Sequence, residues 1–316
     1  MEAWKLGERR LIDVVRRAYD YAWAESDSAF FDLGRRRVLI TNDSITQSTH
    51  IPNGAKPEDA GYFFAAINLS DIAAMGGRPL YFMSSIIIPA GFDTKYLIAF
   101  EKGVRRCLDS YGAKVIGGDL KKGREFALTG IAIGEVERSR MMCKLNMKEG
   151  EALCVTGELG RNAAGYYYLR MSPQKGAAML LDVEPKIREG MFLSANGIRA
   201  ATDLSDGVYS SVYQLNRSLG VGFEIDYASI PVSEEARVVN KRQGISIEQM
   251  CLNFGGDYQL MFSVDEKVLD GLKRKAAAKN IKITRIGTLK GRRNVLVSGS
   301  KRIYIRKRGY EHFISD

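Results

Sequence analysis

Aspartates are the residues of this chain whose type and setting could do chemistry. Most stand beside glycine, serine or apolar residues, where a surface charge is not needed, and several follow a segment that reads as a strand. They are Asp27, Asp43, Asp71, Asp119, Asp203, Asp206 and Asp257. Open α/β sheets place ligand-binding groups at the carboxyl ends of strands, so these side chains are candidates for one shared site. Taken singly, each could instead be a helix cap or a turn residue.

Carboxylates that converge on one site need positive charge. Four such groups about 6 Å apart would repel one another by on the order of 15–20 kcal/mol at an effective dielectric of about 20, as much as the stability of a whole domain. Convergence would therefore require divalent cations or protonation, and spacing alone does not establish convergence. Carboxylate oxygens favour a hard cation such as Mg²⁺.

The sequence lacks the signatures of other catalytic arrangements. It has only two histidines, His50 and His312, which excludes a histidine-rich metal site and makes a Ser-His-Asp triad improbable. There is no G-x-x-x-x-G-K-[ST] loop, and no G-x-G-x-x-G follows a strand. The four cysteines are far apart and form no C-x-x-C, which indicates reduced thiols in a cytoplasmic protein.

The elements that must position the aspartates alternate between helix and strand. A length of 316 residues predicts two domains, and the charged stretch 137–140 divides them into residues 1–138 and 139–316. Expected strands are 37–41, 80–88, 113–116, 126–136, 152–156, 222–226, 258–264 and 281–288, with a hairpin at 294–306. Expected helices are 11–22, one from Pro57, 93–111, and others near 192–200, 207–218 and 265–279. The pattern predicts two α/β domains with mixed sheets.

The charge is distributed unevenly along the chain. The net charge is +10, but residues 267–316 alone carry 15 Lys and Arg against three Asp and Glu, so the rest is slightly acidic. This basic C-terminal region could attract anionic substrates, or nucleic acid. Nucleic acid is not expected, because the chain shows no DNA- or RNA-binding motif. No apolar run approaches the ~18 residues of a membrane span and the start shows no signal pattern, so no membrane partner is expected either.

Four segments carry a family resemblance. They are residues 68–76 (NLSDIAAMG), 116–119 (IGGD), 203–207 (DLSDG) and 309–313 (GYEHF). In this order, and from about residue 6 to the C-terminus, the chain resembles the thiamine-monophosphate kinases, which belong to a superfamily with aminoimidazole ribonucleotide synthase. The resemblance implies an N-terminal domain that dimerises through its sheet, ATP bound near that interface, and an active site between the domains. The reaction it implies transfers the γ-phosphoryl group of ATP to the phosphate of thiamine monophosphate, giving thiamine diphosphate and ADP.

Matching the family's motifs position by position implies a set of site residues. The ligands of several Mg²⁺ ions would be Asp27, Thr41, Asn42, Asp43, Asp71, Asp119, Asp203 and Asp206. The ATP contacts would be Gly118, Asp119, Lys144 and Ser205, with Lys144 standing where the family usually has an arginine; the substrate contacts would be His50, Asp257 and Phe313. No acid–base residue is expected, because the acceptor is already an oxyanion and catalysis is then positioning plus electrostatics.

The chain departs from the family pattern at three places. Ser26 replaces the first of two paired aspartates, Leu120 and Lys121 replace threonines, and Gly256 replaces a glutamate that faces the substrate. Gly256 predicts an intact phosphoryl-transfer core with altered or weaker acceptor binding. Two other functions stay open at this point: a related enzyme of the superfamily with another acceptor, or a non-enzymatic nucleic-acid-binding protein that uses the basic C-terminal region.

Overall fold

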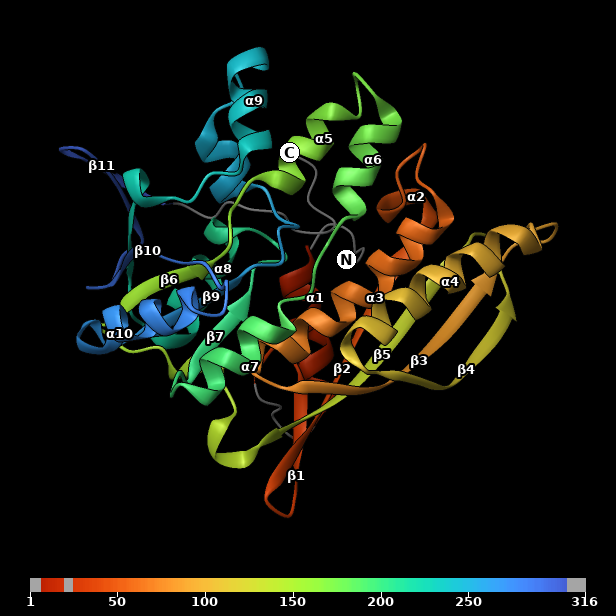
Figure 1. Cartoon of the computed structure of the whole chain (residues 1–316), viewed down its shortest axis with the longest axis horizontal. Helices are drawn as coiled ribbons and strands as arrows, with labels where there is room; N and C mark the ends of the chain where they lie inside the picture. Colours follow the sequence, from red (N-terminus) through yellow and green to blue (C-terminus); the bar gives the residue numbers. More distant parts are fainter. Residues whose placement is uncertain (1–6, 20–24, 306–316) are drawn as a thin grey trace.

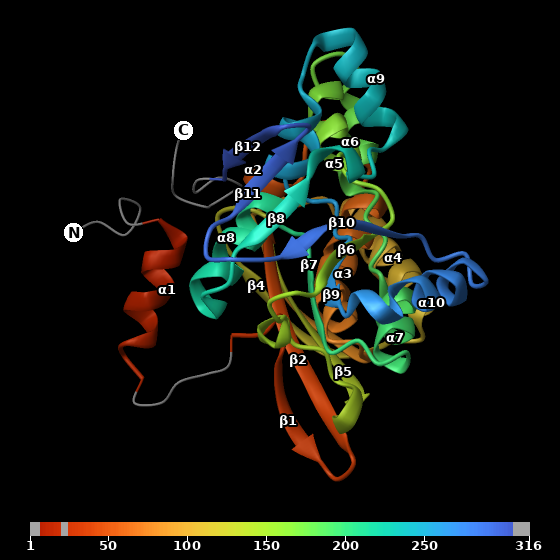
Figure 2. The same cartoon turned by 90° about the vertical axis from the view of Figure 1, so that its left-hand side faces the viewer.

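The computed structural model describes residues 7–19 and 25–305, and all structural statements concern these residues. Phe313 and residues 20–22 of the helix expected at 11–22 lie outside them; that helix already ends at Arg16, and residues 17–19 form a turn and a bend. The first element, α1 (Glu8–Arg16), stands at one side of the molecule and exposes Val14 and Val15 (Figure 2). No helix in the described ranges is long and apolar enough to cross a membrane.

The first sheet has five strands and is mixed. They are β1 (Ala29–Leu33), β2 (Arg36–Thr46), β3 (Arg78–Ile88), β4 (Lys114–Lys122) and β5 (Ala127–Glu137), in the order β1-β2-β5-β3-β4. β3 and β4 are parallel, and the other neighbours are antiparallel. The helices α3 (Pro57–Ala74) and α4 (Thr94–Tyr111) lie against this sheet (Figure 1), and the short α2 (Gln47–His50) follows β2.

Local signals in the sequence explain the bounds of α3 and α4. Pro57 stands in the first turn of α3, where its missing N–H is not needed. The Asp93 side chain accepts a hydrogen bond from the Lys95 backbone N–H (2.8 Å) and so caps the start of α4. Gly112, with φ of 70°, ends α4 in the left-handed conformation that glycine adopts without strain. Both helices were predicted from the sequence and are confirmed.

The second sheet has seven strands and is also mixed. Its order is β12-β11-β8-β10-β6-β9-β7, and only β8 and β11 are parallel. The strands are β6 (Ala152–Thr156), β7 (Ala200–Asp203), β8 (Phe223–Asp226), β9 (Leu260–Val264), β10 (Ile283–Leu289), β11 (Val295–Ser298) and β12 (Lys301–Tyr304). The helices are α5 (Arg161–Tyr168), α6 (Pro173–Leu181), α7 (Ile187–Ala195), α8 (Val208–Leu219), α9 (Glu234–Gln243) and α10 (Glu266–Ala277). Short turns of helix, η2 (Arg138–Arg140) and η3 (Lys144–Asn146), connect the two sheets. The predicted α/β class with mixed sheets is confirmed.

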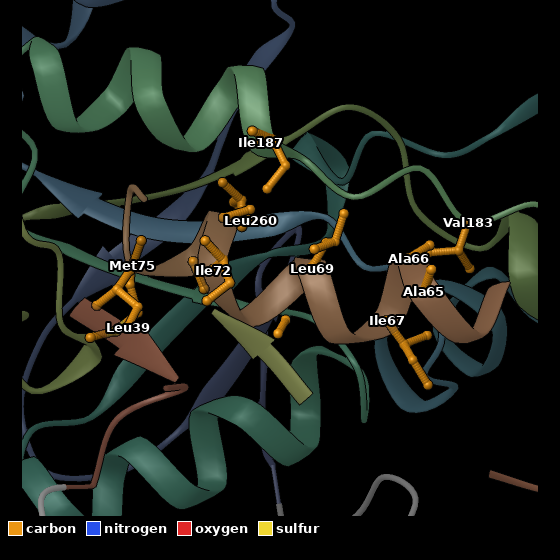
Figure 3. Packing of buried hydrophobic residues seen from close by; sticks show 14 of the residues in the cluster. Leu39, Ala65, Ala66, Ile67, Leu69, Ile72, Met75, Val183, Ile187 and Leu260 are labelled. Carbon is orange, nitrogen blue, oxygen red and sulfur yellow. The ribbon is translucent and has the colours of Figure 1, made fainter. Parts of the chain in front are cut away.

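Helix α3 joins the two halves of the molecule. Its buried residues lie on all sides, as is expected of a helix that is covered by protein all round. One side packs on β2 and β5, and another contacts β7 and α7. Figure 3 shows Leu69 and Ile72 of α3 among Leu39 of the first sheet, Ile187 of α7 and Leu260 of the second sheet. One continuous core therefore fixes α3 against both sheets.

The alternation of β2 decides which side chains face α3. Leu39, Thr41 and Ile45 are buried on the α3 side, and Asp43 shares their face because side chains alternate along a strand. Asn42 is exposed on the opposite, outer face of the sheet. That outer face also carries exposed apolar side chains, among them Tyr81 (43% exposed) and Ile87 (40%) of β3.

The crossing of α3 and α4 depends on two glycines, which generates a stability prediction. A Cβ on Gly103 would lie 1.9 Å from the Glu58 carbonyl oxygen, and a Cβ on Gly61 would lie 1.9 Å from the Phe100 carbonyl oxygen. Gly103→Ala should therefore lower the free energy of unfolding by about 2–3 kcal/mol, because the helices must move apart. Gly271→Ala in α10 is the matched control, since a Cβ there meets nothing within 4 Å, and it should raise the free energy of unfolding by about 0.5–1 kcal/mol. Urea unfolding measures both; changes of the same sign would contradict this account of the crossing.

Candidate functional site

A cavity of about 1120 Å³ lies where the N-terminal segment meets the second half of the chain. Asp27, just before β1, lines it together with Asp203 at the end of β7 and Asp206 just before α8. Lys144 of η3 and Ser205 also line it, as do further charged residues such as Arg16, Glu25 and Arg217. Parts of α1 and α8 also line the cavity. Its volume is of the size that takes a drug- or nucleotide-sized ligand.

Asp27 is held from one side only. Its Oδ1 accepts hydrogen bonds from Lys144 Nζ (3.0 Å) and from Thr202 Oγ1 (2.9 Å). Its side chain is 6% exposed, and Oδ2 is buried without a hydrogen-bond partner among the described residues. A buried carboxylate oxygen without a donor is costly. This orphaned oxygen beside a cavity is what a cation ligand needs.

Helix α3 presents polar side chains to both sheets. The Asn68 Oδ1 accepts a hydrogen bond from the Asp43 backbone N–H (2.9 Å), and its amide fits only because Gly130 has no Cβ. Thr41 Oγ1 donates a short hydrogen bond to the Asp71 carboxylate on the same side. Ser70 Oγ reaches the other sheet and donates to Asp203 Oδ2 at 2.6 Å.

The carboxylates around α3 act on one another. Burial, followed by the charges of Asp43, Asp203 and Asp27, raises the pKa of Asp71 well above its ordinary value. Burial also raises the pKa of Asp43, and burial together with Asp27 raises the pKa of Asp203 to about 7. Burial alone would lower the pKa of Lys144, but Asp27 and then Asp203 and Asp71 raise it above the usual range. The neighbourhood therefore favours positive charge.

The carboxylates nevertheless do not converge on one point in the described residues. No three acidic, histidine or cysteine side chains converge on a single metal position in residues 7–19 and 25–305. Lys144 holds Asp27, Thr41 holds Asp71 and Ser70 holds Asp203. Mg²⁺ is usually held in proteins by one or two carboxylates together with water and substrate phosphates. The all-oxygen set with an orphaned Asp27 oxygen fits Mg²⁺ that arrives with a nucleotide better than a closed protein cage.

Eight of the predicted residues do not line this cavity within one copy of the chain: Thr41, Asn42, Asp43, His50, Asp71, Gly118, Asp119 and Asp257. The sequence placed Asp43 after a strand and Asp119 at the end of one, and both placements were wrong, because β2 and β4 continue through these positions. Asp119 is 54% exposed and pairs with Lys121 (3.0 Å). By its register beside Ser85, it lies on the outer face of the first sheet. Gly118 precedes it in β4, and Asn42 also lies on that outer face.

The residues expected on the substrate side have local partners. His50 ends α2, and its Nδ1 accepts a hydrogen bond from the Thr46 backbone N–H (3.2 Å). Asp257 accepts from the backbone N–H groups of Gly160 (2.6 Å) and Asn162 (3.1 Å), so its carboxylate holds the start of α5. Burial raises the pKa of Asp257 to about 6 even though these N–H groups lower it. Substrate contacts of His50 and Asp257 stay predictions, as does that of Phe313, which lies outside the described residues.

Gly256 has a structural counterpart that the sequence did not reveal. Its φ is +87°, and a Cβ built on it would lie 2.4 Å from Asn162 Oδ1. The Asn162 amide, which donates to the Leu180 carbonyl (2.9 Å), thus fills the space where a side chain at position 256 would begin. A glutamate could not be restored at 256 without moving Asn162. The two residues form a matched pair.

Tyr258 is a candidate site residue that sequence reasoning missed. Its φ of 47° is rare for a residue with a side chain and costs roughly 1–3 kcal/mol, and such strain clusters at functional sites. The ring packs edge-on against Phe63 of α3 with centroids 6.5 Å apart. Burial and then Asp43, Asp203 and other carboxylates raise the pKa of Tyr258 well above its usual value, so the phenol keeps its proton and can donate. A strained φ has no signature in sequence, so only the neighbouring glycines could have hinted at it.

Comparison with known proteins covers nearly the whole chain. The family model "AIR synthase related protein, N-terminal domain" matches residues 25–136, and "AIR synthase related protein, C-terminal domain" matches residues 148–298. The chain is 33% identical to the thiamine-monophosphate kinase of Pyrococcus horikoshii over 271 residues, which is 85% of each chain. It is 28% identical to the thiamine-monophosphate kinase of Methanospirillum hungatei over 97% of this chain and 99% of that one. A solved structure described as AaThiL complexed with AMPPCP and TMP superimposes with a TM-score of 0.87 at 25% identity, covering 99% of each chain.

The raised pKa of Asp203 generates a pH prediction. Its folded value of about 7 exceeds the ordinary value of 3.8, so the folded protein holds a proton that the unfolded chain releases. Without divalent cations, this contribution to stability is present below about pH 4 and is lost as the pH rises toward 7. Asp203→Asn removes it, so the variant should lose less stability than the parent between pH 5 and pH 8, by up to a few kcal/mol.

The measurement is urea unfolding in the presence of a chelator at the two pH values. Asp109→Asn, an exposed carboxylate of α4, is the control and should keep the parent's pH dependence. Equal slopes for the parent and Asp203→Asn would contradict the raised pKa.

Proposed function

We propose the chemistry of the cavity from one premise: the chain belongs to the thiamine-monophosphate kinase family. It uses ATP to phosphorylate thiamine monophosphate, giving thiamine diphosphate and ADP. The observation that carries this function is the match over 99% of the chain to a kinase structure with AMPPCP and TMP bound. A cytoplasmic location, expected from the sequence, stays a prediction.

The cavity residues divide the work of binding and orienting two polyanions. We assign Asp27, Asp203 and Asp206 to hold Mg²⁺ with the nucleotide, with Asp43, Asp71 and Thr41 behind them; the ions supply charge neutralisation between the phosphates. Lys144 and Ser205 bind the phosphates from the cavity wall. The acceptor phosphate is already ionised, so the chain needs no strong general base, which agrees with its two histidines. Tyr258, whose phenol stays protonated near these carboxylates, is assigned to orient them.

The acceptor side is proposed from the family pattern and one local observation. His50, Asp257 and Phe313 would contact thiamine monophosphate, and Gly256 with Asn162 would replace the family glutamate. The support for altered acceptor binding is that Asn162 occupies the start of the missing side chain. An amide carbonyl accepts hydrogen bonds more weakly than a carboxylate, because it carries no charge.

A homodimer explains the residues left outside the cavity. The outer face of the first sheet exposes Tyr81 and Ile87, and the same face carries Asp119 in register with Ser85. A second copy laid on this face would bury the apolar side chains and place Asp119, Gly118 and Asn42 at a shared interface. Such an interface is isologous, with the same patch on both partners.

The activity test is turnover of thiamine monophosphate by the purified chain with ATP and Mg²⁺. Product formation is followed by mass spectrometry, with thiamine and an aminoimidazole precursor as alternative acceptors. Asp71→Asn should lower kcat about 100-fold or more, because an amide has no charge with which to support a cation. The fold should be kept, because burial and the neighbouring carboxylates raise the pKa of Asp71 well above its ordinary value and so favour a neutral side chain at this position. Asp270→Asn, an exposed position on α10, should leave kcat unchanged. Near-normal kcat in Asp71→Asn would contradict the role of the carboxylate group.

The dimer is tested by light scattering at micromolar concentration. Ile131 lies on the outer face of β5 between Asn42 and Met83, so Ile131→Glu would bury a charge in the interface and should give monomers. Ile98 is 57% exposed on α4, which packs on the other face of the sheet, and Ile98→Glu should leave the dimer intact. A parent protein that is strictly monomeric would count against the shared interface.

A further inference from the structure

Lys144 lies in the candidate metal site, and its ammonium group already forms an ion pair with a carboxylate there. Its Nζ lies 3.0 Å from Asp27 Oδ1, and the two side chains are only 24% and 6% exposed. Burial and Asp27 raise the pKa of Asp203, and the positive charge of Lys144 offsets part of that rise. The ammonium group therefore acts on two of the carboxylates assigned to Mg²⁺.

The backbone that carries Lys144 is anchored on both sides. The Cys143 N–H donates to the Arg199 carbonyl (2.9 Å), and the Asn146 side-chain amide donates to the same carbonyl (3.0 Å). The lysine side chain, in contrast, has a flexible four-carbon stem and lines the cavity. The ammonium group can therefore change partners within the cavity while the backbone stays in place.

The orphaned Asp27 oxygen limits what Lys144 does. The lysine satisfies Oδ1 together with Thr202, but Oδ2 has no partner among the described residues. A compact single charge thus neutralises Asp27 only in part. A divalent cation would satisfy Asp27 more fully, yet it would meet the ammonium at close range, and two cations side by side repel.

We propose that Lys144 is a resident counter-ion of the empty site: it stabilises the clustered carboxylates in the nucleotide-free protein, and leaves Asp27 for the nucleotide phosphates when Mg²⁺ and ATP bind together. This proposal rests on the proposed function. Lys144 then weakens the binding of Mg²⁺ alone and strengthens the binding of ATP. The site is then loaded by the metal–nucleotide complex and discriminates against the free ion.

Opposite effects on the two ligands are the signature of this role. In Lys144→Gln, the Kd for Mg²⁺ alone should fall about tenfold or more, since tenfold corresponds to only about 1.4 kcal/mol of lost repulsion. The KM for ATP should rise about tenfold in the same variant, because the phosphates lose a cation. Lys144→Arg keeps the charge and should stay within about threefold of the parent in both measurements.

Calorimetric titration with MgCl₂ in the absence of nucleotide gives the first value, and steady-state kinetics give the second. Lys186→Gln is the matched control, because Lys186 is 12% exposed and pairs with Glu184 (2.7 Å) but does not line the cavity. It should change neither value. If Lys144 had only a structural role, its replacement would weaken the binding of Mg²⁺ and of ATP together.

A measurement on the parent protein keeps the test independent of how the variant folds. Amine labelling followed by peptide mass spectrometry should find Lys144 protected in the free protein, more reactive with MgCl₂ alone, and protected again with Mg²⁺ and a non-hydrolysable ATP analogue. Labelling that does not respond to MgCl₂ overturns the proposal.

Two further results overturn it. One is an unchanged or weaker Mg²⁺ affinity in Lys144→Gln, and the other is the absence of Mg²⁺ binding in both parent and variant. Turnover of thiamine monophosphate by the parent would leave the proposed function standing in either case. Loss of that turnover with an intact fold would instead contradict the proposed function.

Discussion

Carboxylates that are buried near one another cost free energy unless something positive or protonated offsets them, and the site of this chain is arranged around that constraint. Asp43, Asp71 and Asp203 have raised pKa values because they are withdrawn from water and face further carboxylates. The free chain offers three partial remedies: protonation, hydroxyl donors such as Thr41 and Ser70, and the ammonium of Lys144. Each of these three interactions can be replaced by a stronger one. These contacts offset part of the carboxylate repulsion, and the proposed Mg²⁺ would offset the rest.

The position of α3 follows from the same constraint. A helix that carries Asn68, Ser70 and Asp71 into the interior needs partners for these groups on both sides, and it finds them on β2 and β7. The apolar residues between them pack on all sides and bind the two sheets into one core (Figure 3). Motion of one half against the other would therefore break polar contacts and apolar packing together. The side chains of Asp71 and Asp203 are thus held by contacts that α3 makes with both sheets.

The sequence predicted those elements whose ends carry a chemical marker. Pro57, Asp93 and Gly112 mark the bounds of α3 and α4, and both helices were placed well. It failed where a strand continues through polar residues, as at Asp43 and Asp119, because hydrogen bonding to neighbouring strands decides strand length and leaves no local mark. Strand β1 was missed for the same reason, since its five residues pair only with β2 across a tight turn.

The sequence predicted the residue types of the site better than it predicted their geometry. The aspartates were candidates for one shared site, whereas the two faces of a strand separate Asn42 from Thr41 and Asp43 by simple alternation. Asp257 was expected to contact the substrate, and the structure adds that its oxygens accept hydrogen bonds from backbone N–H groups at the start of α5. The fit of Asn162 against Gly256 depends on a contact between segments nearly a hundred residues apart, and the packing of Tyr258 on Phe63 joins segments still farther apart. Such information is not contained in a single local motif.

The structure changes what the net charge of the chain indicates about substrate binding. The sequence confined the basic excess behind the net charge of +10 to residues 267–316 and left open whether it attracts anionic substrates. The cavity itself is lined by Arg16, Arg217 and Lys144, and of these Lys144 is paired with Asp27 and acts on Asp203. Long-range attraction by the basic region would be screened within about 10 Å at ordinary salt, whereas a buried ion pair is screened far less. If Lys144 acts as proposed, recognition of the two phosphorylated substrates depends less on the total charge than on this one lysine, which exchanges the Asp27 carboxylate for a phosphate.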